Sequence, residues 1–137
     1  MQLKRAVLTA SLIVGFAIIL VGCSATKGLN ISNSDVNMII IQSGTTGESV
    51  EVMDAAAIQH ITDNYNSLKL QRAKKISTDG WAYSVTWYDK EGNALESIAY
   101  GINFNKNRAV TGLMKDGYNW TIKDGEVDNA LIESLLP

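Results

Sequence analysis

The sequence predicts an α+β fold: an antiparallel sheet of about five to seven strands, with two helices packed on one face. Short apolar or alternating segments, separated by Gly, Asn and Asp turns, predict strands over much of the stretch 36–122. Two segments, at 55–67 and 126–136, repeat apolar residues at helical spacing instead. Because the helices are set apart from runs of strands, the α+β class is favoured over alternating strand–helix units.

The first half of the predicted domain contains two strands and a helix. A β-branched strand at 36–42 is apolar on both faces, which indicates a central position, and a turn at 43–47 leads to a second strand at 48–53. Asp54 is a good N-cap for the helix that follows at 55–67. The apolar stripe of this helix is expected to be buried and consists of Ile58, Ile61, Tyr65 and Leu68.

A meander of about five strands and a last helix are expected in the second half. The strand at 70–76 is basic, which suits an edge that must resist pairing with other chains. After the strand at 81–88, further strands are expected at 94–104, 108–114 and 118–122. The closing helix at 126–136 is expected to bury Val127, Leu131 and Leu135.

The strand at 81–88 has the strongest alternation in the chain. One face carries Trp81, Tyr83, Val85 and Trp87. We expect this face to pack against the helices, with Trp87 buried, although its aromatic rings could instead stack a sugar or a base. The opposite face is the candidate ligand face and consists of Ala82, Ser84, Thr86 and Tyr88.

The N-terminal segment has the pattern of a secretory signal. Lys4 and Arg5 precede an uncharged, mostly apolar stretch at 6–21 that is short for a membrane span of roughly 20 residues. Leu20, Val21, Gly22 and Cys23 then follow, and this tetrapeptide resembles the lipobox of bacterial lipoproteins. An uncleaved N-terminal anchor helix is the alternative.

The lipobox resemblance implies a covalent lipid anchor. Cys23 Sγ would receive a diacylglyceryl group, and a signal peptidase would cut between Gly22 and Cys23. Two acyl chains are enough for stable anchoring. The expected organisation is then a signal peptide at 1–22, the lipidated Cys23 with a flexible tether at 23–34, and a single domain at 35–137. A flexible tether of this length would reach roughly 18 Å.

Charge and cysteine content limit the partners and cofactors. Without residues 1–22, 10 basic residues face 14 acidic ones, so nucleic acid is not an expected partner. Cys23 is the only cysteine and His60 the only histidine, which excludes both a disulfide and a Cys/His zinc site. No metal or other cofactor is expected beyond the lipid on Cys23.

Three segments resemble known types of site but have a plainer interpretation. Asp89, Glu91 and Asn93 alternate like calcium ligands, but Tyr100 stands where a calcium loop requires an acidic residue, so a hairpin turn is expected. His60 lies off the buried helical stripe and is expected at the surface rather than as a catalytic base. The glycines at 44–47 lack the lysine of a phosphate-binding loop.

A second resemblance concerns the domain itself. The segments Gly80-Trp81-Ala82-Tyr83 and 87–93 (Trp-Tyr-Asp-Lys-Glu-Gly-Asn), with a leucine-rich C-terminal helix, are similar to small uncharacterised lipoprotein domains of Gram-positive bacteria. The similarity covers roughly 36–136 and rests on turns and core aromatic residues. It implies no activity and no catalytic residues.

These observations predict a lipid-anchored lipoprotein on the extracytoplasmic face of the cell membrane. We expect it to be non-catalytic and to bind a partner or ligand at the cell envelope. Two alternatives stay open: a hydrolase that acts on envelope material through carboxylates, and an inhibitor or immunity lipoprotein. A concave cleft with converging carboxylates would favour the hydrolase, and an exposed apolar sheet face would favour a protein binder.

Overall fold

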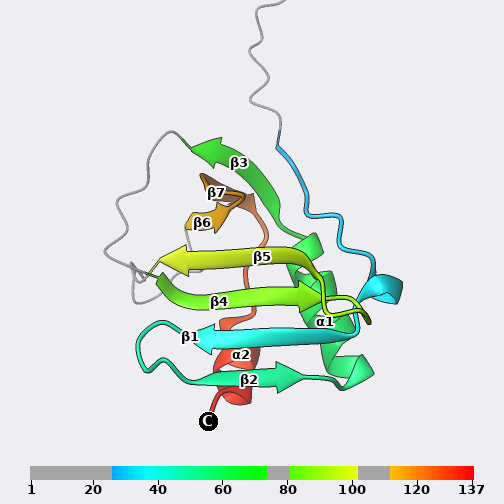
Figure 1. Cartoon of the computed structure of the whole chain (residues 1–137). Helices are drawn as coiled ribbons and strands as arrows, with labels where there is room; N and C mark the ends of the chain where they lie inside the picture. The colour runs from blue at the N-terminus through cyan, green and yellow to red at the C-terminus, as the bar shows by residue number, and fades with distance from the viewer. Residues whose placement is uncertain (1–25, 74–80, 102–111) are drawn as a thin grey trace, which may run out of the picture.

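The computed structural model describes residues 26–73, 81–101 and 112–137, and it confirms the α+β class with an antiparallel sheet and two helices (Figure 1). Cys23 and its flanking motif at 20–22 therefore lie outside the described residues, as do parts of the strands expected at 70–76, 94–104 and 108–114. In chain order, the elements are η1 (Asn33–Asp35), β1 (Met38–Ser43), β2 (Ser49–Val52), α1 (Ala55–Asn66), β3 (Lys69–Ala73), β4 (Trp81–Tyr88), β5 (Ala94–Gly101), β6 (Gly112–Lys115), β7 (Tyr118–Asp124) and α2 (Asn129–Leu135).

The strand order is β2-β1-β4-β5-β6-β7-β3, and every pairing is antiparallel. As expected, β1 lies inside the sheet and the basic strand β3 lies at an edge. The expected meander is wrong in one respect, because β3 does not neighbour β4: β4 pairs with β1, and β3 pairs with β7. Local sequence patterns cannot show this, since both pairings join segments that are far apart in the chain.

The sheet consists of two parts that meet along a narrow contact. In the first part, which consists of β2, β1, β4 and β5, neighbouring strands pair over most of their length. In contrast, β5 and β6 share only the register pairs Ala99–Met114 and Tyr100–Leu113. Beyond this contact, β6, β7 and β3 curve away from the plane of the other strands (Figure 1). The expected single sheet of about five to seven strands is therefore not matched exactly.

Helix α1 agrees closely with the sequence prediction. The Asp54 carboxylate caps its first turn by accepting a hydrogen bond from the Ala57 backbone N–H at 2.8 Å. All four residues of the expected stripe are buried: Ile58, Ile61, Tyr65 and Leu68. This stripe packs on the β4 face that carries Trp87, where the rings of Tyr65 and Trp87 meet edge to face with centroids 5.1 Å apart.

Helix α2 is shorter than expected and turns a different residue toward the core. It begins at Asn129 rather than near position 126, because Gly125 adopts φ +84° and Asp128 caps the first turn through the Leu131 N–H. Ile132 is its fully buried residue, and Val127 is buried just before the helix, whereas Leu131 and Leu135 are only half-buried. Both helices lie behind the sheet in Figure 1.

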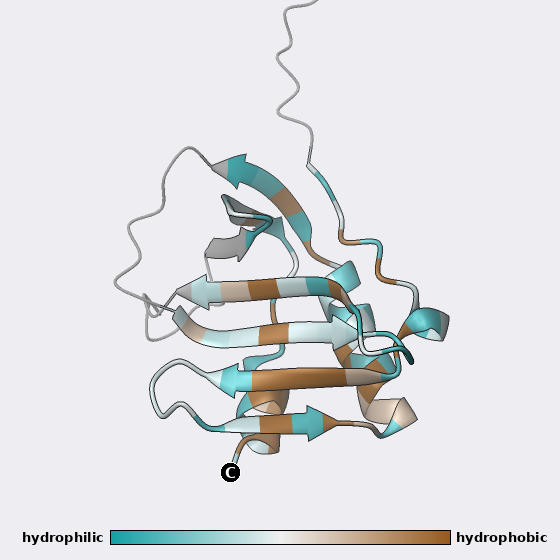
Figure 2. Ribbon diagram, in the orientation of Figure 1, coloured by the Kyte–Doolittle hydropathy of each residue, from teal (hydrophilic) through white to brown (hydrophobic). Residues whose placement is uncertain are grey.

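The core lies between the sheet and the two helices. Trp87 and Val85 are completely buried, as predicted, whereas Trp81 and Tyr83 of the same β4 face are only half-buried. Its neighbours in this layer include Ile39, Ile41, Val85, Ile98 and Tyr100, and Figure 2 shows the corresponding hydrophobic bands across β1, β4 and β5.

The segment before β1 is part of the domain and not a free tether. Leu29 is 3% exposed and Ile31 is 9% exposed, and both belong to the core. The Lys27 backbone exchanges two hydrogen bonds with Leu70 of β3, at 2.7 and 2.8 Å. The Asn66 side chain exchanges two more with the Ile31 backbone, at 3.0 and 2.8 Å. The ordered domain therefore begins at least at Lys27, and a tether spanning 23–34 is too long.

Candidate functional site

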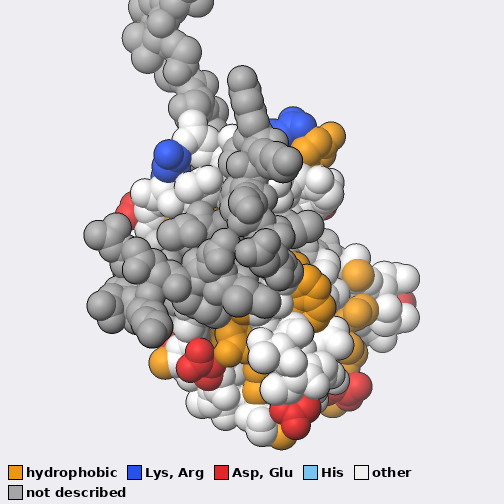
Figure 3. Space-filling view, turned by 90° about the vertical axis from the view of Figure 1, so that its left-hand side faces the viewer, with side chains coloured by type: hydrophobic (Ala, Val, Ile, Leu, Met, Phe, Trp, Pro, Cys, Tyr) orange, Lys and Arg blue, Asp and Glu red, His pale blue; other side chains and the backbone are white. Residues whose placement is uncertain are grey.

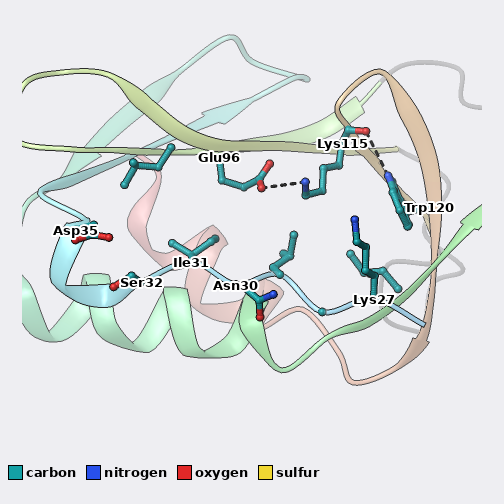
Figure 4. A pocket seen from close by; sticks show the side chains of 12 residues that line it. Lys27, Asn30, Ile31, Ser32, Asp35, Glu96, Lys115 and Trp120 are labelled. Carbon is teal, nitrogen blue, oxygen red and sulfur yellow. Dashed lines mark hydrogen bonds and ion pairs between the residues drawn. The ribbon is translucent and has the colours of Figure 1, made fainter. Parts of the chain in front are cut away.

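A pocket of about 360 Å³ lies between this N-terminal segment and the curved end of the sheet. One wall is the chain from Lys27 to Ser32, with Asp35 of η1 beside it (Figure 4). The other wall comes from side chains of β3, β5, β6 and β7. These are Leu70, Leu95, Glu96, Lys115 and Trp120.

Strand register explains why polar groups meet on this side of the sheet. Glu96 is directly opposite Trp87 in the β4–β5 pairing, so it projects from the face that packs on the helices. Trp120 is opposite Arg72 and Leu113, and Leu70 is opposite Ile122. Neither helix forms this pocket, which is instead closed by the N-terminal segment.

An ion pair forms the sheet wall of the pocket. Lys115 Nζ lies 3.1 Å from Glu96 Oε2 and 2.6 Å from Asp116 Oδ2, and the side chains of Lys115 and Glu96 are only 20% and 16% exposed. Partial burial alone would lower the pKa of Lys115, but the two carboxylate partners outweigh it and raise that pKa. Lys115 is therefore a charged structural group rather than a neutral amine suited to act as a nucleophile or base.

Trp120 is fixed beside this ion pair. Its indole N–H donates to the Lys115 backbone carbonyl at 3.3 Å, and the ring lines the same pocket. The pocket thus combines an indole and aliphatic side chains with charges of both signs. Such a mixed lining is typical of sites that orient a small ligand through a few polar groups.

The candidate ligand face of β4 lies on the opposite side of the sheet from this pocket. Ala82 is 4% exposed and therefore cannot serve as an open contact residue. Ser84, Thr86 and Tyr88 are half-buried, and the Thr86 hydroxyl is engaged with the Ser97 hydroxyl at 2.9 Å. These four residues share a face but form none of the pocket.

The structure also places the other residues singled out from the sequence. His60 is exposed, as expected, and its Nε2 lies 3.2 Å from Asp128 Oδ2. The Asp89 carboxylate accepts hydrogen bonds from the backbone N–H groups of Glu91 and Asn93, which is the arrangement of a hairpin turn. These bonds lower the Asp89 pKa, with the contribution of Asn93 the largest. Among the residues that the structure describes, no cluster of His, Cys, Asp and Glu could hold a metal ion.

The pocket residues were not identified from the sequence, although one signal was present. In β5, Glu96 alternates with Ile98 and Tyr100, so a carboxylate stands on the apolar side of an otherwise ordinary strand. A carboxylate on the buried face of a strand is rarely found without an oppositely charged partner. Lys115, its partner, could not be found this way, because the β5–β6 register joins two separate segments.

No family model, curated protein or solved structure matches this chain. Within the described part of the chain, neither helix is long and apolar enough to cross a membrane.

Proposed function

We propose that the protein is a lipid-anchored lipoprotein of the extracytoplasmic membrane face, and that it binds a small ligand without catalysing a reaction. The observation that carries this proposal is the position of the pocket: its wall begins at Lys27, four residues after Cys23. Four extended residues span at most about 14 Å. A diacylglyceryl group on Cys23 would therefore hold the pocket near the membrane surface.

The charge distribution supports this orientation. In Figure 3, the visible Lys and Arg side chains lie near the end where the described chain begins, whereas most visible acidic side chains gather toward the opposite end. Lys27 and Arg72 are exposed residues of the segment and strand at that end. Basic groups near the anchor favour contact with anionic lipid headgroups.

The continuity of the sheet also supports a binding role. We infer that the two parts of the sheet act as one curved wall with both helices on a single face. The Tyr83 hydroxyl donates to Glu133 of α2, while Tyr65 of α1 packs on Trp87 four positions further along β4. These contacts support an arrangement in which both helices lie against the same side of β4 and the end near β6 and β7 is left for the pocket.

The hydrolase alternative requires a pair of free carboxylates that converge in the pocket, and of the two in its lining only Asp35 is without an ion-pair partner among the described residues. Glu96 is held by Lys115, which favours a structural role for this carboxylate over general acid or base catalysis. The ion pair therefore favours the binding role.

The anchor is tested by replacing Cys23 with Ser and labelling cells with a fatty acid. We expect the Cys23→Ser protein to carry no label and to accumulate as the uncut precursor, whereas the matched Ser24→Ala protein is labelled and cut. Labelling of Cys23→Ser, together with cleavage after Gly22, would show that the lipobox interpretation is wrong.

A further inference from the structure

The two ends of the pocket carry opposite charges. In Figure 4, Lys27 and Trp120 lie at one end of the pocket and Asp35 at the other, with Ile31 between them. Among the described residues, neither the Lys27 ammonium nor the Asp35 carboxylate has an ion-pair partner. The remaining charges of the lining, on Glu96 and Lys115, neutralise each other.

This arrangement selects the charge pattern of a ligand. A simple anion would be attracted to Lys27 but repelled by Asp35, and a simple cation would meet the reverse situation. A ligand with a negative group at one end and a positive group at the other satisfies both. Of the apolar residues in the lining, Ile31 and Leu70 are buried in the core, so the apolar surface for the body of the ligand comes from Leu95, which is 43% exposed, and from the half-buried Trp120.

We propose that the pocket binds a short zwitterionic peptide, with its C-terminal carboxylate at Lys27 and its N-terminal ammonium at Asp35. A pocket of about 360 Å³ is near the lower end of the range of roughly 300–1,000 Å³ for small-ligand sites, which fits a peptide of about two or three residues. An apolar side chain of the peptide packs against the half-buried Trp120. This assignment deepens the proposed function by naming the ligand class of the same pocket.

The charges of the peptide are tested with capped ligands. The full chain, purified in detergent, is titrated calorimetrically with alanyl-leucine, with its N-acetyl derivative and with its C-terminal amide. Because both contacts are partly exposed to solvent, each cap is expected to weaken binding by about three- to fivefold. Equal affinity for the free and capped peptides, or no heat of binding up to millimolar peptide, would overturn the proposal.

Two variants test which terminus of the peptide is bound at each end of the pocket. Lys27→Gln should remove the discrimination against the amide and keep the discrimination against the acetyl peptide, and Asp35→Asn should do the opposite. Both side chains are exposed and bond no other described group, so the fold should be unchanged. Matched controls are Lys123→Gln and Glu51→Gln, which lie on exposed positions outside the pocket and should bind like the parent.

The outcomes separate this proposal from the anchor. If Lys27→Gln and Asp35→Asn leave both discriminations intact, the peptide site is wrong, whatever the state of Cys23. If Cys23 carries no fatty-acid label but the capped peptides bind more weakly as expected, the peptide site is supported and only the proposed membrane anchor is wrong.

Discussion

The indole N–H of Trp87 donates a hydrogen bond to the Thr62 hydroxyl at 3.0 Å, and both side chains are completely buried. Thr62 in turn donates to the Ile58 carbonyl at 2.7 Å. This chain of hydrogen bonds ties the C-terminal end of β4 to the middle of α1. It satisfies the one polar atom of the largest core side chain, which would otherwise be costly to bury.

Removing the acceptor should leave the indole N–H unsatisfied. We expect Thr62→Val to lower the free energy of unfolding by about 1–3 kcal/mol, the usual cost of a buried donor without a partner. In the Trp87→Phe background, which has no such donor, the same change should cost much less. Chemical denaturation of the four proteins measures this difference, and equal costs in both backgrounds would contradict the role of the hydrogen bond.

Truncating the tryptophan should be more damaging than truncating its neighbour. Trp87→Ala leaves a large cavity and should cost roughly 3–5 kcal/mol. Tyr88, half-buried on the other face of β4, is the matched control, and Tyr88→Ala should cost far less. Denaturant midpoints that rank the two variants in the reverse order would contradict the burial of this face.

Asn66 should control how firmly the N-terminal wall of the pocket is held. Its side chain makes both hydrogen bonds to the Ile31 backbone, so Asn66→Ala leaves that N–H and carbonyl without these partners. We expect faster hydrogen exchange at Ile31 and a stability loss of about 1–2 kcal/mol. Asn30→Ala, a change at an exposed position of the same segment, should leave the Ile31 exchange rate as it is.

The close approach of β1 and β4 should make one glycine irreplaceable. A Cβ on Gly44 would lie 2.0 Å from the Trp81 carbonyl oxygen, so Gly44→Ala must displace backbone. Gly47, three residues later, has φ +76° but open space around it, and Gly47→Ala should cost only about 1 kcal/mol. If Gly44→Ala lowered the melting temperature less than Gly47→Ala, the backbones at Gly44 and Trp81 would not lie so close together.

Two buried tyrosines should limit stability at high pH. Burial raises the pKa of Tyr65 well above its usual value of 10.0, and the neighbouring Tyr100, whose hydroxyl accepts a hydrogen bond from Tyr65 at 3.1 Å, raises it further. The Tyr100 pKa is also raised, chiefly by burial. The folded state therefore keeps protons that the unfolded chain releases above pH 10, and the free energy of unfolding should fall as the pH rises beyond that value.

Absorbance of the tyrosinate form and denaturation at increasing pH test this expectation. Tyr65→Phe should flatten the loss of stability above pH 10, whereas Tyr118→Phe, at a 49% exposed position, should leave it unchanged. A native protein that ionises all its tyrosines near pH 10 without unfolding would contradict the burial of this pair.

The sequence could predict features that depend on local periodicity. Alternation in 81–88 was sufficient to place Trp87 in the core, and helical spacing was sufficient to identify Ile58, Ile61 and Tyr65. The pairing of β3 with β7 was not predictable, because it depends on which distant strands meet rather than on local pattern.

The pocket was missed for a related reason. Small and polar residues around Leu29 and Ile31 resemble a tether, and only the contacts with Leu70 and Asn66 convert this segment into a wall. Leu29 and Ile31 are the only two buried residues of this short segment, and two positions are too few to form a recognisable apolar periodicity in the sequence. Lys27 and Asp35 line one pocket with Glu96, Lys115 and Trp120 only after the segment has folded against the sheet.

The pairing of β3 with β7 has a consequence for when the domain can form. Strand β3 emerges early from the ribosome, yet the partner that covers its edge is among the last segments to be made. The chain must first close a loop that contains β4, β5 and β6, and such long-range closure slows folding. Until β7 has been synthesised, β3 therefore lacks the strand that pairs with it in the folded sheet, and its unpaired backbone groups can pair with other chains.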